Sequence, residues 1–133
     1  MRNFGECETI FTGKVLVLSE NKSRMEIMNP AQAALRRVQV DGCAIRTGPR
    51  CDFLVITPAD SELFIELKGS HILRAGLQLQ KSMEQLSSSK DRECFIVSSR
   101  VPLATDAQRL KNYFRDQLQT PLTIKNRSCN YTV

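Results

Sequence analysis

Two apolar runs near the middle of the chain, residues 53–56 and 63–65, are separated by the turn-forming segment 57–61. Short apolar runs on either side of Pro, Asp and Ser residues are typical of a β-hairpin. When the turn is centred on Ala59, side chains alternate so that one face of the hairpin is wholly apolar. The same register predicts three opposed pairs, which are Asp52 with Glu66, Leu54 with Phe64, and Ile56 with Glu62.

Two later segments have the spacing of amphipathic helices. Apolar residues recur at three- and four-residue steps over residues 72–86, and Ser70 precedes them as a capping residue. A second segment of this kind ends near Leu118, and Thr105 with Gln108 predicts a capping box at its start. We therefore expect two helices in the C-terminal half of the chain.

Shorter segments predict the remaining elements. Strands are expected at residues 14–18, 38–41, 94–97 and 122–124. A short helix is expected over residues 31–37, directly after a proline. The resulting order predicts an α/β fold with a mixed central sheet flanked by helices. We expect one domain over residues 1–133, with its core at roughly residues 30–125.

The composition is that of a globular protein with a basic surface. Of 133 residues, 41% are hydrophobic and 25% are charged, and the formal net charge is +5. These proportions exclude disordered and low-complexity classes, and the positive charge favours an anionic partner such as nucleic acid. No apolar stretch approaches the roughly 18 residues of a membrane span and no secretory signal is visible, so we expect a cytoplasmic protein with no membrane partner. The five cysteines include no C-x-x-C pair, which predicts reduced thiols and neither a disulfide framework nor a zinc site.

The hairpin register brings acidic side chains together at one end of the hairpin. Asp52 and Glu66 face each other across the two strands, and Lys68 lies on the same face. Opposed carboxylates repel unless one is protonated or a cation lies between them, and carboxylate oxygens suit Mg²⁺ or Mn²⁺. A lysine beside such a metal could position a water molecule or stabilise charge on phosphorus. The alternative is an exposed hairpin whose charged residues are solvated and bind no metal.

This motif resembles the active site of the PD-(D/E)xK nuclease superfamily. Asp52 is followed fourteen residues later by Glu66-Leu67-Lys68 on the adjacent strand, and then by a helix. The predicted order of helix, three strands, helix and strand over residues 30–97 also resembles the αβββαβ core of this restriction-endonuclease-like fold. The resemblance implies that Asp52, Glu66 and the main-chain carbonyl of Leu67 bind the metal, and that Lys68 acts on the water.

The resemblance implies further site positions. Many nucleases of the superfamily carry a glutamine on the helix after the E-x-K strand, which here is Gln78. The predicted polar face of that helix also carries His71, Arg74 and Ser82, and its alternative interpretation is an ordinary solvated surface. Family members often add a glutamate from the preceding helix, for which Glu20 and Glu26 are the candidates.

We therefore expect a metal-dependent nuclease, with Mg²⁺ or Mn²⁺, that hydrolyses phosphodiester bonds of nucleic acid. DNA is the expected substrate, and a restriction, junction-resolving or phage-defence role fits this class. Because the chain has little beyond the catalytic core, substrate selection would come from a homodimer or a partner protein. The alternatives are a non-catalytic nucleic-acid- or protein-binding module on the same fold, and an RNA-cleaving toxin.

Overall fold

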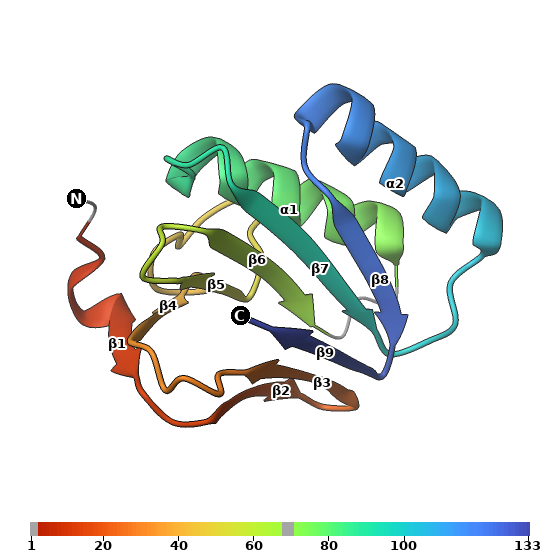
Figure 1. The fold of residues 1–133 in the computed structure, drawn as a ribbon. Helices are drawn as coiled ribbons and strands as arrows, with labels where there is room; N and C mark the ends of the chain where they lie inside the picture. Colours follow the sequence, from red (N-terminus) through yellow and green to blue (C-terminus); the bar gives the residue numbers. More distant parts are fainter. Residues whose placement is uncertain (1–2, 68–70) are drawn as a thin grey trace.

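The computed structural model describes residues 3–67 and 71–133, which form two α-helices and two β-sheets (Figure 1). The six-stranded sheet has the order β1-β4-β5-β6-β7-β8, and the three-stranded sheet has the order β2-β3-β9. The expectation of an α/β fold with a mixed central sheet is confirmed. In chain order the elements are η1 (Gly5–Cys7), β1 (Glu8–Phe11), β2 (Val15–Glu20), β3 (Ser23–Met28), β4 (Leu35–Gln39), β5 (Phe53–Ile56), β6 (Glu62–Leu67), α1 (Ile72–Leu86), β7 (Arg92–Ser98), α2 (Ala104–Leu118), β8 (Leu122–Asn126) and β9 (Ser128–Thr132).

The large sheet lies between the two helices and the small sheet (Figure 1). Leu79 of α1 and Phe114 of α2 pack with Phe64 of β6 in the core on the helical side. On the opposite face, Ile65 of β6 packs with Ile27 of β3 in a second core. The hairpin formed by β5 and β6 is therefore covered on both faces, and every residue of β6 is buried.

The connections of the sheet place the carboxyl ends of its parallel strands at one edge. Strands β1, β4, β5 and β6 pair antiparallel, whereas β7 and β8 continue the sheet in parallel. Parallel neighbours require crossover connections, which α1 and α2 supply. Because α1 begins shortly after β6 ends, its first turns lie at the edge where β6 leaves the sheet.

The predicted hairpin is confirmed in its register. Leu54 lies opposite Phe64 and Ile56 lies opposite Glu62. The apolar face of the hairpin packs against the three-stranded sheet, as the alternation predicts. The turn chemistry fixed this register locally, since Ser61 donates its amide hydrogen to Thr57 Oγ1 at 3.1 Å.

The helix predicted over residues 31–37 is wrong, because this part of the chain enters strand β4. Leu35 and Val38 are fully buried, and β4 pairs with β1 on one side and with β5 on the other. Pairing with two strands satisfies the backbone amides and carbonyls that a helix would have satisfied internally. The local helical signal is therefore overridden by strands that lie far away in sequence.

Other expected strands are confirmed, and three strands were missed. The segments 94–97 and 122–124 lie in β7 and β8, and the segment 14–18 lies in β2 except for its first residue. The segment 38–41 overlaps the end of β4. The missed strands are β1, β3 and β9, and β9 pairs in parallel with β3 from the other end of the chain. Such a long-range pair leaves no local signal beyond a short alternation.

Both predicted helices of the C-terminal half are confirmed, but their predicted caps are not. Ser70 lies outside the described residues. Helix α2 begins one residue before Thr105, its capping residue is Leu103, and no side chain caps it. The predicted capping box is therefore wrong, and the Gln108 side chain instead donates to Asn112 Oδ1 at 2.9 Å. Neither helix of the described chain is long and apolar enough to cross a membrane.

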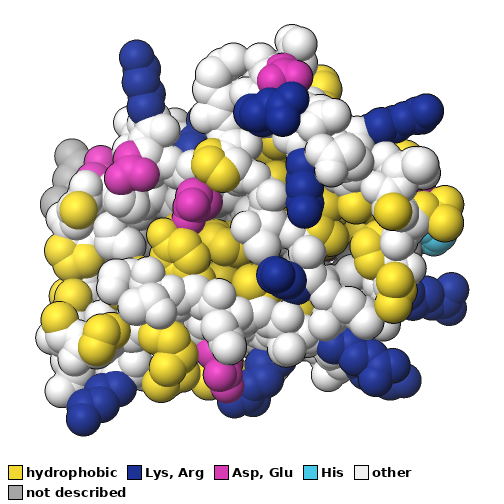
Figure 2. Space-filling view, turned by 45° about the vertical axis from the view of Figure 1, so that its right-hand side comes forward, with side chains coloured by type: hydrophobic (Ala, Val, Ile, Leu, Met, Phe, Trp, Pro, Cys, Tyr) yellow, Lys and Arg dark blue, Asp and Glu magenta, His cyan; other side chains and the backbone are white. Residues whose placement is uncertain are grey.

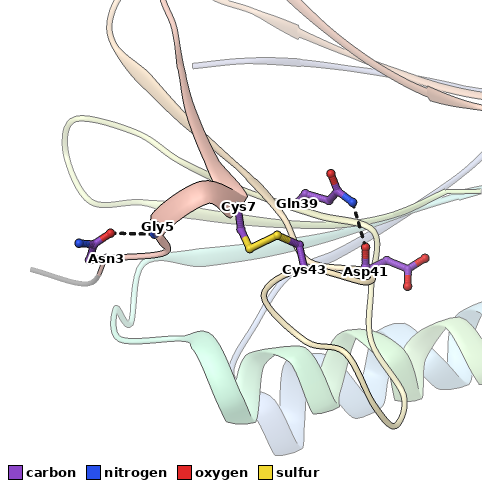
Figure 3. Close-up of a disulfide and its surroundings, with 6 residues drawn as sticks. All are labelled: Asn3, Gly5, Cys7, Gln39, Asp41 and Cys43. Carbon is purple, nitrogen blue, oxygen red and sulfur yellow. Dashed lines mark hydrogen bonds between the residues drawn. A yellow bond between two sulfur atoms is a disulfide. The ribbon is translucent and has the colours of Figure 1, made fainter.

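The prediction that all five thiols are reduced is also wrong. Cys7 and Cys43 form a disulfide with a Cα–Cα distance of 5.6 Å (Figure 3). It joins the end of η1 to the loop that follows β4, across 36 positions of sequence. The odd cysteine count and the lack of a spacing motif predict no such bridge. The two cysteines come together only through the pairing of β1 with β4, which the local sequence does not indicate. Cys51, Cys94 and Cys129 are free and buried.

Candidate active site

Asp52 lies directly before β5 and is held by the strand opposite it. Its amide donates to the Ile65 carbonyl at 3.1 Å, and its Oδ2 accepts the Leu67 amide hydrogen at 2.7 Å. Only 8% of Asp52 is exposed. The register of β5 with β6 ends at Phe53 opposite Ile65, one residue after Asp52. The Asp52 side chain lies beside that of Glu66, the neighbour that the sequence predicts.

Glu66 is the more buried of the two facing acids. It is 6% exposed, and its Oε1 has no hydrogen-bond partner among the described residues. A hydrogen bond joins the Asp52 and Glu66 carboxyl groups. Burial, followed by the facing charge of Asp52, raises the pKa of Glu66 to about 9. Without a cation, Glu66 therefore holds a proton at neutral pH.

The pKa of Asp52 is raised as well, but less. Burial raises it to about 6, the hydrogen bond from the Leu67 amide opposes this change, and the nearby Glu20 carboxylate adds to it. The two carboxyl groups thus lose their protons in two separate steps, as expected for buried groups that interact strongly. In this arrangement a divalent cation would offset both the desolvation cost of the two ionised carboxylates and the repulsion between them.

The third acid of the site is Glu20, at the end of β2. It interacts with Asp52 both through space and by a side-chain hydrogen bond. Glu26, the other candidate, lies on β3, where its carboxylate pairs with Arg24 at 2.7 Å. The structure therefore brings Glu20 to the site from the small sheet, whereas the resemblance implied a glutamate on a helix. The strand alternation that ends at Glu20 was the available signal.

Asp52 and Glu66, but not Glu20, border a cavity of about 440 Å³ that α1 also lines. Asp52 and Glu66 line it from the sheet, and Arg74 and Gln78 line it from α1. The loop after β4 contributes Arg50, whose Nε donates to Asp41 Oδ1 at 2.6 Å, and both of these residues also line the cavity. The cavity is therefore lined by acidic side chains from the sheet and by two arginines, Arg50 and Arg74.

The structure separates the residues of the predicted polar face of α1. Gln78 and Arg74 line the cavity with the two acids, as expected if that face borders the carboxylates. His71 is exposed and is not among the cavity residues. Ser82 is fully buried, so the expectation that it lies on the polar surface is wrong. Its Oγ accepts the Cys51 amide hydrogen at 2.8 Å.

The residues present fit a hard divalent cation with few protein ligands. Two facing carboxylates match the oxygen preference of Mg²⁺ and Mn²⁺, which keep several waters, and one of them has a buried oxygen that no described residue contacts by a hydrogen bond. Over residues 3–67 and 71–133, no three His, Cys, Asp or Glu side chains are grouped so as to hold one metal ion. The Asp52 and Glu66 pair is therefore the candidate ligand set, with Glu20 behind Asp52. The predicted ligation by the Leu67 carbonyl stays a prediction.

Lys68, the residue predicted to act on the water, lies outside the described residues. Its assignment therefore depends on the sequence alone, in which it follows Glu66 by two positions.

Comparisons with models of protein families, with curated proteins and with solved structures gave no match.

Proposed function

We propose that this protein is a metal-dependent nuclease that hydrolyses phosphodiester bonds of nucleic acid, with DNA as substrate and Mg²⁺ or Mn²⁺ as cofactor. One observation carries the proposal: two buried carboxyl groups face each other at the edge of a cavity, and one has an oxygen without a partner among the described residues. A purely structural acid in such a place would be expected to have its hydrogen bonds satisfied.

Each residue of the site has a defined task in this proposal. Asp52 and Glu66, with the Leu67 carbonyl, would hold the cation, which supplies Lewis-acid activation of a phosphate oxygen and a water molecule. Lys68 would orient and deprotonate that water, and Gln78 would orient a water ligand or a base. Arg74, on the helical side of the cavity, would hold a phosphate of the substrate.

The surface supports an anionic partner. The chain carries a formal charge of +5, and Figure 2 shows Lys and Arg side chains spread over one face of the molecule, among apolar and acidic ones. A positively charged surface suits a polyanion, whose scissile phosphate would reach a cation held by Asp52 and Glu66. We also propose that substrate selection comes from a homodimer or a partner protein, and that the protein acts in the cytoplasm.

The finer fold assignment belongs to the same proposal. Strands β4, β5 and β6, then α1 and β7, correspond to the strand, helix and strand part of a restriction-endonuclease-like core. The helix expected before them is replaced by β2 and β3, which also supply Glu20. We propose that this is a variant of that core in which a hairpin takes the place of the first helix.

The test is cleavage of labelled linear, single-stranded and four-way-junction DNA, and of RNA, with Mg²⁺, with Mn²⁺ or with a chelator. We expect metal-dependent cleavage, which Glu66→Gln lowers by about 100-fold or more, equivalent to about 2.7 kcal/mol of transition-state stabilisation. The matched control is Glu84→Gln, an exposed acid on α1 that pairs with Lys81 at 3.5 Å and should cleave normally.

Two results would contradict the proposal. One is equal cleavage by Glu66→Gln and the wild type. The other is no cleavage of any substrate together with a melting temperature that Mg²⁺ and Mn²⁺ leave unchanged, which would favour the non-catalytic binding module. Lys68→Ala separates the roles further, because it should lose cleavage and keep metal binding.

A further inference from the structure

Ser82 is a buried polar residue on the side of α1 that faces the candidate site. Its side chain is fully buried, and its Oγ has two partners. It accepts the Cys51 amide hydrogen at 2.8 Å and donates to the Gln78 carbonyl at 2.8 Å. The first bond spans 31 positions of sequence, so it connects α1 to the segment that leads into β5.

The amide that Ser82 accepts belongs to the residue directly before Asp52. Cys51 is fully buried and lies two residues before β5 begins, outside the ladder of strand hydrogen bonds. Its buried amide therefore needs a partner from outside the hairpin. The next residue is held by the sheet on both sides. The Asp52 amide donates to the Ile65 carbonyl at 3.1 Å, and the Asp52 carbonyl accepts from Val40 at 3.0 Å.

These contacts divide the support of Asp52 between two layers of the fold. The sheet fixes its main chain from one side, and the Ser82 hydroxyl fixes the preceding peptide from the helical layer. The same hydroxyl is bonded to the Gln78 carbonyl, one helical turn earlier on the helix that lines the cavity. The Ser82 hydroxyl therefore connects the peptide before Asp52 to the main chain of Gln78 through two hydrogen bonds.

We infer that Ser82 is a positioning residue, which holds the Asp52 carboxylate against the Leu67 amide and sets its place relative to Gln78. These hydrogen bonds carry the geometry of the inference, and its meaning for catalysis rests on the proposed nuclease function. Ser82 touches neither substrate nor metal in this scheme. It acts through the peptide before the first acid.

A purely structural serine would stabilise the packing of α1 without affecting Asp52 in particular. Ser87 provides the matched control for that role. Its Oγ donates to Glu62 Oε1 at 2.6 Å, at the opposite end of β6 from Glu66. Ser82→Ala and Ser87→Ala each remove one hydroxyl that is hydrogen-bonded to the large sheet or to a segment beside it. Only Ser82 is bonded to the residue next to Asp52.

The experiment is amide NMR on the full chain, with the Leu67 amide as probe because it donates to Asp52 Oδ2 at 2.7 Å. In Ser82→Ala we expect the Leu67 amide proton to shift and its hydrogen exchange to accelerate by about tenfold or more, since a looser Asp52 no longer holds it. Mg²⁺ affinity, followed in the same spectra, should fall by about tenfold, as for other residues that orient metal ligands. Ser87→Ala should leave both unchanged.

A conservative variant completes the test. Ser82→Thr keeps the hydroxyl oxygen and should restore the Leu67 amide and the Mg²⁺ affinity. If Ser82→Ala does not fold, Ser82→Cys, whose sulfur is a weaker acceptor, should give the same changes in smaller size.

Either of two results would overturn the inference. One is a Leu67 amide that is unchanged in Ser82→Ala, or in Ser82→Cys where the alanine variant does not fold. The other is the same change in Ser87→Ala. If the wild type binds no Mg²⁺, the nuclease proposal fails, and the Leu67 amide alone decides whether Ser82 positions Asp52.

Discussion

Glu62 and Glu66 are two buried glutamates on one strand and one face of it, four residues apart, yet their surroundings differ. Glu62 is fully buried, and its two carboxylate oxygens accept from Ser87 Oγ at 2.6 Å and from the Ser88 amide at 3.0 Å. It also lies opposite Arg92 in the register of β6 with β7. Glu66 lies opposite Ile96 in that register, and its Oε1 has no partner in the described chain.

The difference separates a structural acid from a site that is prepared for a ligand. At Glu62 the fold supplies the donors that a buried carboxylate requires. At Glu66, burial raises the pKa, and the carboxylates of Asp52 and Glu20 raise it further. The ionised form of a glutamate is thus stabilised by hydrogen bonds at the Glu62 end of the strand and destabilised at the Glu66 end. A bound cation would stabilise the ionised form only at Glu66.

Of the two single substitutions to glutamine, the one at Glu62 is expected to have the larger effect on stability. Glu62→Gln should lower the free energy of unfolding by about 1–3 kcal/mol, because hydrogen bonds to a charged group are lost inside the protein. Glu66→Gln should change it by no more than about 0.5 kcal/mol at pH 7, since Glu66 is already protonated there and glutamine resembles that form. Urea denaturation with a chelator present measures both. Equal losses would mean that the two sites are alike.

A separate effect is expected from pH. The pKa of Glu66 is raised from 4.5 to about 9, and that of Asp52 from 3.8 to about 6. The folded state therefore binds more protons than the unfolded state over this range, so the pair contributes most stability below pH 4 and loses it as the pH rises to 9. We expect the melting temperature without metal to fall over this window less steeply in Glu66→Gln than in the wild type.

Metal reverses the sign of this dependence. A cation binds the ionised carboxylates and releases their protons, so the rise in melting temperature on adding Mg²⁺ should be larger at pH 8 than at pH 5. Glu62→Gln should retain this behaviour, because Glu62 lies at the other end of the strand. A Mg²⁺ effect that does not depend on pH would argue against ligation by Glu66.

The parts of the fold that the sequence predicts well are those decided by near neighbours. The register of β5 with β6 follows from the turn between them, and the stripe that buries Leu79 and Met83 follows from helical spacing. The closeness of the Asp52 and Glu66 side chains was predictable for the same reason. The neighbours of Ser82 could also have indicated its burial, because it lies three residues after Leu79 and directly before Met83, beside the apolar stripe.

The parts that it predicts poorly depend on contacts between distant segments. Strand β4 was mistaken for a helix because its partner β1 lies more than twenty residues earlier. The bridge between Cys7 and Cys43 depends on that same pairing, and so carries no local signature. Closing a loop of this length is expected to stabilise the fold by about 2–4 kcal/mol, which the cysteine count alone does not indicate.

Glu20 provides the smallest predicted effect and the most direct test of what distinguishes the Glu66 end of the strand. Its charge and its hydrogen bond raise the pKa of Asp52, so Glu20→Gln should lower that pKa from about 6 towards 3.8. Carbon NMR of the Asp52 carboxyl measures this shift. The acidic limb of the cleavage profile should move to lower pH by the same amount, and Mg²⁺ affinity should fall by less than about tenfold, because Glu20 acts behind the ligands.

Glu26→Gln is the matched control for Glu20, since Glu26 lies on the neighbouring strand and pairs with Arg24. It should leave the pKa of Asp52 and the cleavage profile unchanged. If both variants move the Asp52 titration equally, the effect is one of general surface charge, and the acids do not form a connected site. If only Glu20→Gln moves it, the small sheet takes part in the active site, and the hairpin of β2 and β3 supplies an acid that the sequence pattern had led us to expect from a helix.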